Sequence, residues 1–277
     1  MPTRTIRPQA LIFTLFGDYV CQRSDRIWIG SLIRLLALFG VSEQATRTTV
    51  SRMTRRGWLC LSRTGTRAGY ALTPAASRLI EEGTARIFQP PTAGEGWDGL
   101  WSLVAYSIPE EQRESRDRFR RELGWLGYGM LTNALWISPN DRRARVADLV
   151  EALQIKPCVQ SFSGHLDGFV SCRELAARCW NLADLNAAYA AFIEKYQPQL
   201  CDYQRRLTAQ PPPEDRHCFA QRFMLTHEYR RFPYRDPRLP AELLPADWRG
   251  ADAQSLFQTY HRLLADPANR YFDAIFR

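Results

Sequence analysis

The chain has 277 residues, of which 45% are hydrophobic and 24% charged, which excludes a disordered protein and allows two or three globular domains. Its formal charge is +8. Residues 1–90 hold thirteen Arg and five Asp or Glu, a difference of +8, whereas residues 91–277 hold twenty-four charges of each sign. A basic segment joined to a neutral remainder is typical of a nucleic-acid-binding domain with partner domains, although a basic surface without a ligand would give the same count.

The first part of the chain predicts helices over residues 9–22 and 30–39, a turn at Gly40-Val41, and a third helix over 42–56. Ser42 is a good N-cap and Gly57 follows the last turn. A helix, a short turn with Gly and a basic helix form the helix-turn-helix pattern of DNA-binding proteins.

The third helix has two different faces. Thr46, Val50 and Met53 are spaced to meet a core. The other face has no acid beyond Glu43 and carries groups that can reach phosphates and base edges. We expect base contacts from the N-terminal part of this helix and phosphate or minor-groove contacts from the remaining Arg residues. The expected base-contacting residues are Gln44, Arg47, Thr48 and Ser51, and the expected phosphate-contacting residues of the helix are Arg52 and Arg55.

A basic hairpin follows this helix. Residues 58–61 and 70–73 predict two short strands, separated by a polar turn that contains Arg63 and Arg67. Such a hairpin after a helix-turn-helix is the wing of a winged helix, and its two Arg residues could reach a phosphate or a narrow minor groove. A further helix is expected from Pro74.

Residues 89–96 interrupt the pattern of predicted helices and strands and indicate a linker. Beyond it, strands are predicted at 100–108, within 128–137 and at 155–162, and helices at about 110–126 and 141–153. Strands separated by helices favour a small α/β sandwich of ferredoxin-like type. The charges of the helix after residue 110 indicate a solvent-exposed face with i,i+4 ion pairs.

From about residue 172 the chain is predicted to be helical, with the last helix at 251–264 and a surface loop at 211–215. Residues 230–240 hold four Arg and three Pro, so they cannot form regular structure. Arg230, Arg231, Tyr234 and Arg235 could bind an anionic or aromatic ligand. The alternative is that these Arg residues pair with carbonyl groups and Asp236 and hold a long loop in place.

The cysteines are scattered without a CxxC pair, and no apolar run reaches the length of a membrane span or a signal peptide. We therefore expect a cytoplasmic protein with free thiols and no membrane partner. Catalytic motifs are poorly represented, because His227-Glu228 lacks the second His of a zinc helix and no phosphate-binding Gly loop occurs. We expect no catalytic residues, no metal and no cofactor.

Several segments, taken in order, resemble the PaaX family of bacterial repressors of phenylacetate catabolism. They include residues 14–20, Gly40-Val41 through Arg47-Thr48, Gly57-Trp58-Leu59, Trp136-Ile137-Ser138-Pro139, and above all the run from Phe219 to Pro240 with residues 243–248. The resemblance covers about residues 11–270. Thr46 and Met53 stand where family members tend to carry Val and Leu.

The resemblance implies an α+β protein of three parts: a winged helix-turn-helix at 1–89, a ferredoxin-like middle domain at 97–170, and a mainly helical C-terminal domain at 171–277. It also implies a cytoplasmic homodimer that binds a double-stranded DNA operator. An aryl-acetyl-CoA thioester such as phenylacetyl-CoA would then release the repressor from its DNA.

Two alternatives belong to other functional classes. The middle domain is similar in layout to a small nuclease of CRISPR adaptation, which would make the chain a nucleic-acid-processing protein. Such a nuclease needs an Asp near the end of its first strand, where this chain has Ser107. We therefore expect a dimerisation or coupling module. A CoA-thioester-dependent enzyme with a DNA-binding domain is the second alternative, and turnover of acyl-CoA thioesters would distinguish it from a sensor.

Overall fold

The computed structural model describes residues 7–64, 67–88, 96–207 and 212–276, and this part of the chain is an α+β protein. It divides into two compact units. Unit 1 is drawn from Met1–Pro90, Phe192–Arg231 and Asp252–Arg277, and unit 2 from Pro91–Ala191 and Phe232–Ala251. These units group residues by contact in space, whereas the ranges 1–89, 97–170 and 171–277 follow the chain and stay a prediction. The expected linker at 89–96 lies outside the described residues except for Gly96.

Unit 1 begins with helix α1 (Pro8–Leu15), which continues as the π-helix η1 (Phe16–Val20). The sequence predicted one regular helix here, and the wider π-helical turns are a correction. Pro8 starts the helix at a position where a missing N–H costs nothing. The apolar face was predicted correctly, since all its members are fully buried: Leu11, Ile12, Leu15, Phe16 and Tyr19.

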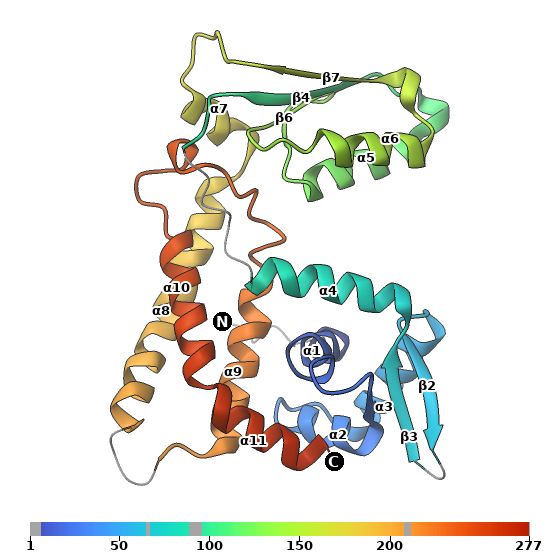
Figure 1. Cartoon of the computed structure of the whole chain (residues 1–277), viewed down its shortest axis with the longest axis vertical. Helices are drawn as coiled ribbons and strands as arrows, with labels where there is room; N and C mark the ends of the chain where they lie inside the picture. The colour runs from blue at the N-terminus through green and yellow to red at the C-terminus, as the bar shows by residue number, and fades with distance from the viewer. Residues whose placement is uncertain (1–6, 65–66, 89–95, 208–211, 277) are drawn as a thin grey trace. The chain divides into compact units, whose positions relative to one another are not determined.

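A three-stranded sheet and three further helices follow η1 in unit 1 (Figure 1). The sequence did not predict β1, which adds a third strand to the expected hairpin. The elements are β1 (Arg26–Trp28), α2 (Ile29–Ala37), α3 (Glu43–Arg55), β2 (Leu59–Thr64), β3 (Arg67–Leu72) and α4 (Pro74–Phe88). The three strands pair antiparallel in the order β1-β3-β2. The turn residues 65–66 of the hairpin lie outside the described residues.

Helices from the C-terminal part of the chain complete unit 1. They are α9 (Asp215–Tyr229), α11 (Ala265–Phe276), and the portions of α8 (Leu182–Leu207) and α10 (Gly250–Leu263) that belong to this unit. The sequence predicted that the helix at 251–264 is the last one, and α11 corrects this. Pro267 lies in the first turn of α11, where proline is tolerated. Phe219, Phe223 and Phe272 are fully buried in the same core as α1 and α2. The C-terminal helices therefore share one hydrophobic core with the N-terminal helices.

Unit 2 contains a four-stranded antiparallel sheet in the order β5-β6-β4-β7. Two strands occur where the sequence predicted one strand within 128–137, because residues 133–134 form a turn between them. Helices α5 and α6 lie on the same side of the sheet (Figure 1). Phe119 and Leu123 of α5 and Val146 of α6 are buried against Val104 of the sheet. The elements are β4 (Trp101–Tyr106), η2 (Glu110–Gln112), α5 (Arg113–Trp125), β5 (Gly129–Thr132), β6 (Leu135–Ser138), α6 (Arg143–Leu153), η3 (Lys156–Cys158) and β7 (Val159–Gly164).

The remainder of unit 2 packs on another core. Helix α7 (Cys172–Cys179) begins with a capping box formed by Ser171 and Glu174. Trp101, Leu175 and Leu182 are buried together with Leu243 of the short helix η4 (Ala241–Leu243). None of the helices described is both long and apolar enough to cross a membrane. All seven cysteines lie in the described part of the chain and are free thiols: Cys21, Cys60, Cys158, Cys172, Cys179, Cys201 and Cys218.

Candidate nucleic-acid interface

Helix α3 is held at both ends by local interactions. The Ser42 side chain accepts a hydrogen bond from the backbone N–H of Ala45 at 3.2 Å, as expected of an N-cap. Gly57 has a φ of +70°, a conformation that favours glycine after a helix. These two residues fix where the basic helix starts and stops.

The two faces of α3 differ as the sequence predicted. Thr46, Val50 and Met53 are buried, and Thr49, which the sequence analysis did not assign to this face, is buried with them. The Thr46 hydroxyl donates to the carbonyl of Ser42 at 3.0 Å, which satisfies a polar group inside the core. The opposite face is exposed over every residue proposed to contact DNA: Gln44, Arg47, Thr48, Ser51, Arg52 and Arg55.

One acidic group interrupts this positive face. The carboxylate of Glu43 lies in the first turn of α3 and forms an ion pair with Arg47, at 2.8 Å. Both side chains are more than half exposed, so the pair is worth little in water and can open at small cost. Arg47 can therefore exchange the carboxylate for another acceptor.

The β2–β3 hairpin carries the other two expected Arg residues. Arg63 pairs with Ala68 and Arg67 pairs with Thr64 in the strand register, and both Arg side chains are exposed. The structure adds Arg26 of β1, which the sequence analysis missed. Its guanidinium donates to the Ser62 hydroxyl at 3.2 Å and so lies beside the hairpin. Arg26 lies beside the hairpin because residues 26–28 pair with β3. A strand of three residues has too short a pattern to be predicted from the sequence.

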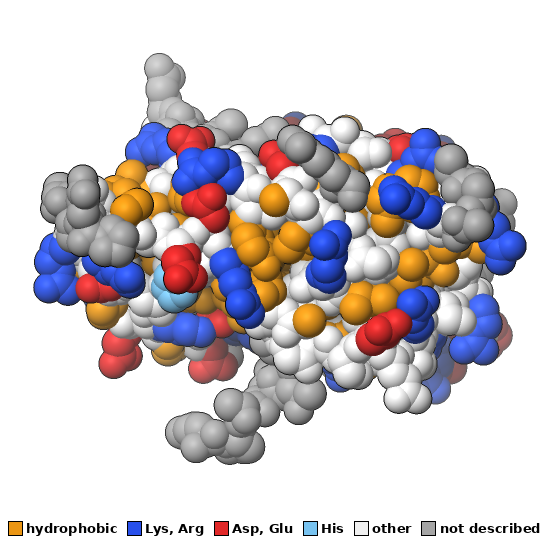
Figure 2. Space-filling view, turned by 90° about the horizontal axis from the view of Figure 1, so that it is seen from below, with side chains coloured by type: hydrophobic (Ala, Val, Ile, Leu, Met, Phe, Trp, Pro, Cys, Tyr) orange, Lys and Arg blue, Asp and Glu red, His pale blue; other side chains and the backbone are white. Residues whose placement is uncertain are grey.

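Arg and Lys side chains are also spread over the face seen from below Figure 1, where they lie among hydrophobic side chains (Figure 2). In this view basic groups are not confined to one spot. Charge alone therefore does not mark a ligand site on this face, and the arrangement on α3 and the hairpin carries more information.

The four expected effector residues fall in different units. Arg230 and Arg231 follow α9 in unit 1, whereas Tyr234 and Arg235 belong to unit 2. Arg231, Tyr234 and Arg235 are exposed. The Tyr234 ring packs on Trp125 with centroids 5.0 Å apart.

Asp236 helps to hold the irregular segment after residue 232 through two hydrogen bonds. Its carboxylate accepts hydrogen bonds from the Tyr189 hydroxyl and from the backbone N–H of Arg238, each at 2.7 Å.

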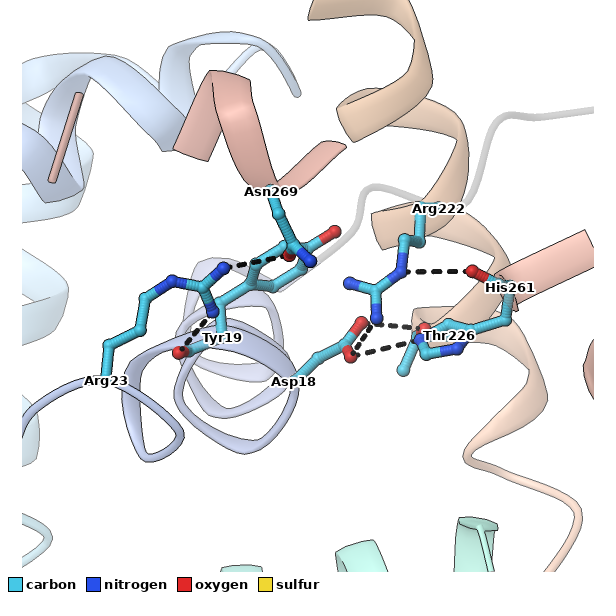
Figure 3. A network of polar contacts seen from close by, with 7 residues as sticks. All are labelled: Asp18, Tyr19, Arg23, Arg222, Thr226, His261 and Asn269. Atoms are coloured by element: carbon cyan, nitrogen blue, oxygen red, sulfur yellow. Dashed lines mark hydrogen bonds and ion pairs between the residues drawn. The ribbon is translucent and has the colours of Figure 1, made fainter. Parts of the chain in front are cut away.

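A buried polar network in unit 1 was not foreseen (Figure 3). Asp18, in the π-helix η1, is 2% exposed. One carboxylate oxygen lies 3.4 Å from Arg222 of α9 and 3.1 Å from Nε2 of His261 of α10. The other accepts a hydrogen bond from Thr226 at 2.9 Å. Its members are far apart in the sequence, so only the isolated acid in an apolar helix could have signalled it.

The electrostatics of this network favour an ionised Asp18. Burial alone would raise the pKa of Asp18, but the charges of Arg222 and His261, with hydrogen bonds from His261 and Thr226, outweigh burial and lower that pKa. Arg222 also lies over the Tyr19 ring, 4.8 Å from its centroid, and donates to the carbonyl of His261 at 3.2 Å. The buried charges are therefore compensated within the network.

In unit 2, Ser107 directly follows β4 and is exposed, and its backbone N–H donates to the carbonyl of Cys158. This serine occupies the place where a nuclease of the related layout would need a carboxylate. Within the described residues, no group of three His, Cys, Asp or Glu side chains is placed to hold a metal ion.

The fold and the candidate site define a class: an α+β protein whose N-terminal helices end in an exposed basic helix and hairpin. Three family models match consecutive parts of the chain. They are described as PaaX-like protein (residues 7–76), PaaX protein central Cas2-like domain (94–176) and PaaX-like protein C-terminal domain (180–274). With the similarity described next, these matches show that the chain belongs to the PaaX family.

One curated relative is the transcriptional repressor PaaX of Escherichia coli (strain K12). It is 33% identical over 262 residues, which cover 94% of this chain and 81% of the relative. A solved structure, the uncharacterized protein Rv0674 from Mycobacterium tuberculosis, matches with a TM-score of 0.60 and 22% identity. The match covers 98% of this chain and 99% of that one, and at this identity it supports the fold alone.

Proposed function

We propose that this protein is a DNA-binding transcriptional repressor of an aromatic, phenylacetate-type catabolic operon. The observation that carries the proposal is the exposed face of α3, where Arg47, Arg52 and Arg55 lie with polar side chains and only Glu43 is acidic. A neutral protein surface would mix both signs, whereas a DNA-binding helix needs cations for phosphates and donors for base edges. The similarity to a transcriptional repressor supports the same function.

The proposal includes a winged helix-turn-helix. Helices α2 and α3 would form its helix-turn-helix, and the β2–β3 hairpin would be the wing. Gln44, Arg47, Thr48 and Ser51 would then contact base edges, because the N-terminal part of a recognition helix enters the major groove. Arg52, Arg55, Arg63 and Arg67 would contact phosphates or the minor groove.

Unit 2 would serve as a dimerisation or coupling module. Its strand order, with β4-α5-β5-β6-α6-β7 along the chain, supports the ferredoxin-like layout. A homodimer would place two recognition helices in successive major grooves about 34 Å apart, on a partly palindromic operator. The protein would act in the cytoplasm as a regulator and not as an enzyme.

The effector in this proposal is an aryl-acetyl-CoA thioester, phenylacetyl-CoA being the first to test. It carries several phosphate charges, which Arg residues bind well. Arg230, Arg231, Tyr234 and Arg235 are the candidate contacts. To raise the operator Kd a hundredfold, the effector must favour the state that does not bind DNA by about 2.7 kcal/mol.

The test is a binding titration of the purified protein on DNA from upstream of its own gene, at fixed salt, with phenylacetyl-CoA, free CoA or neither. Tight sequence-dependent binding that only the thioester abolishes would support repressor and effector together. Binding that is indifferent to the thioester would retain the repressor and reject this effector. Weak, salt-sensitive binding to all genomic fragments would reject the operator-binding function. Hydrolysis or transfer of the acyl group during the assay would instead favour a thioester-dependent enzyme.

A further inference from the structure

Helix α9 connects two candidate effector residues to the α1–η1 segment within unit 1. Its C-terminal end leads into Arg230 and Arg231, two of the candidate effector contacts. One turn earlier, Thr226 bonds to Asp18 and His227 bonds to Thr14. Thr226 and Arg230 are four residues apart, about 6 Å along the helix. A shift at the end of α9 is thus delivered directly to the α1–η1 segment.

The contacts between α9 and the α1–η1 segment resist separation. Asp18 is fully enclosed, with Arg222, Thr226 and His261 around its carboxylate (Figure 3). Pulling a buried carboxylate away from its partners leaves uncompensated charges, which costs far more than moving the two elements together. The second bond, between the Thr14 hydroxyl and Nδ1 of His227 at 2.9 Å, is also buried. We therefore expect α9 and the α1–η1 segment to move as one body.

The α1–η1 segment in turn positions the recognition helix. Helix α1 contacts α3 as well as α9. Leu11 and Leu15 of α1 lie in one fully buried core with Val50 and Met53 of α3. Asp18 lies in a π-helix, an uncommon element that is often found at functional sites. Since tightly packed cores transmit small displacements, movement of α1 reaches α3.

We propose that Asp18, Arg222, Thr226 and His261 are positioning residues through which α9 transmits effector binding to the recognition helix α3. The inference rests on the proposed function and deepens it, because it assigns the route of regulation. These residues touch neither DNA nor effector. They act by holding α9 and the α1–η1 segment together.

The experiment compares the full-length chain with Thr226→Val, which keeps the side-chain shape but removes the hydroxyl donor, and Thr226→Ser, which keeps the hydroxyl. The matched control is His217→Gln, an exposed position on the same helix. The operator Kd is measured without and with saturating phenylacetyl-CoA, and the ratio gives the coupling factor. We expect Thr226→Val to lower this factor at least tenfold, Thr226→Ser to stay within threefold of wild type, and His217→Gln to leave it unchanged.

A second readout needs neither operator nor effector. Amide hydrogen exchange is followed in peptides from 8–20, 43–55 and 265–276. Thr226→Val should accelerate exchange in the first two peptides at least tenfold over its effect on the third, whereas simple loss of stability would accelerate all three alike. Asp18→Asn provides a second substitution in the same network. Uniform acceleration, or wild-type exchange and coupling in both folded variants, would overturn the inference. A wild-type protein without operator or thioester response would instead reject the proposed function, and the exchange experiment would still decide the packing route.

Discussion

In α3, Glu43 and Arg47 lie one helical turn apart and their charged groups meet at 2.8 Å, so the candidate base-reading arginine is partly neutralised before it meets any ligand. Glu43 also lies in the first turn of α3, where a negative charge interacts favourably with the helix dipole. Glu43 thereby stabilises the helix and restrains its positive charge. The two roles can be separated by substitution.

Glu43→Gln should tighten binding to random DNA and reduce discrimination between operator and random DNA. In the wild-type protein the Glu43 carboxylate would lie close to DNA phosphates and repel them. The substitution removes this repulsion and releases Arg47 from its ion pair. We expect the random-DNA Kd to fall about threefold at low salt, on the order of the charge effects of exposed groups. The helix itself should lose roughly 0.3–1 kcal/mol of stability. The measurement is a titration on both DNAs at two salt concentrations.

Glu114→Gln, in the exposed charged helix of unit 2, is the matched control and should leave both affinities unchanged. Weaker operator binding by Glu43→Gln would contradict the prediction and would mean that Glu43 orients Arg47 for its contact.

Arg47→Ala and Arg55→Ala should differ in kind. Arg47 lies in the first half of α3, where side chains reach base edges, so its loss should cost roughly 1–3 kcal/mol on the operator and relax sequence specificity. Arg55 lies in the last turn, so its loss should weaken all DNA sequences alike and reduce the salt slope by about one. The measurement is Kd on operator and random DNA over a salt series. Equal effects of the two substitutions on both DNAs would refute the assignment of roles.

The core face of α3 could be predicted from the sequence because it depends on local spacing. Thr46, Val50 and Met53 repeat at the period of a helix, and all three are buried. The end of α3 was equally local, since Gly57 follows the last turn as expected and has a φ of +70°. Exposure of the Arg-rich face follows from the burial of the other face.

Features that depend on distant residues could not be predicted. The partners of Asp18 are more than two hundred positions away in the sequence, and no periodicity connects them. Strand β1 is three residues long and is stabilised by pairing with β3, not by its own pattern. Helix α11 lies beyond the expected last helix, and its Phe272 is buried in the core that it shares with α1 and α2. In each case tertiary contacts decide the local structure.

His227 predicts a loss of stability in mildly acidic solution. Burial, together with the charges of Arg230 and Arg231, lowers the pKa of His227 from 6.5 to about 4. Between these two values the unfolded chain binds a proton that the folded chain does not, so the free energy of unfolding decreases as pH falls through this window. The decrease should reach about 3 kcal/mol at the lower end. The measurement is chemical unfolding at pH 7.5, 5.5 and 4.5.

His227→Asn, which keeps a polar group near the position of Nδ1, should remove most of this pH dependence. His217→Asn, at an exposed position of the same helix, should retain it. The pH dependence would be assigned to other groups if His227→Asn retained the full decrease.

The effector proposal is tested most directly at Arg231, which is exposed just beyond α9. Arg231→Ala should leave the operator Kd unchanged in the absence of ligand, because this residue is not among the candidate DNA contacts. It should raise the concentration of phenylacetyl-CoA needed for half release about tenfold, which is the loss of one charge-assisted contact to a phosphate. Arg216→Ala, exposed at the opposite end of α9, is the matched control and should behave as wild type. If Arg231→Ala and Arg216→Ala both release at the wild-type concentration, the thioester does not bind through Arg231, and Arg235 of unit 2 becomes the next position to substitute.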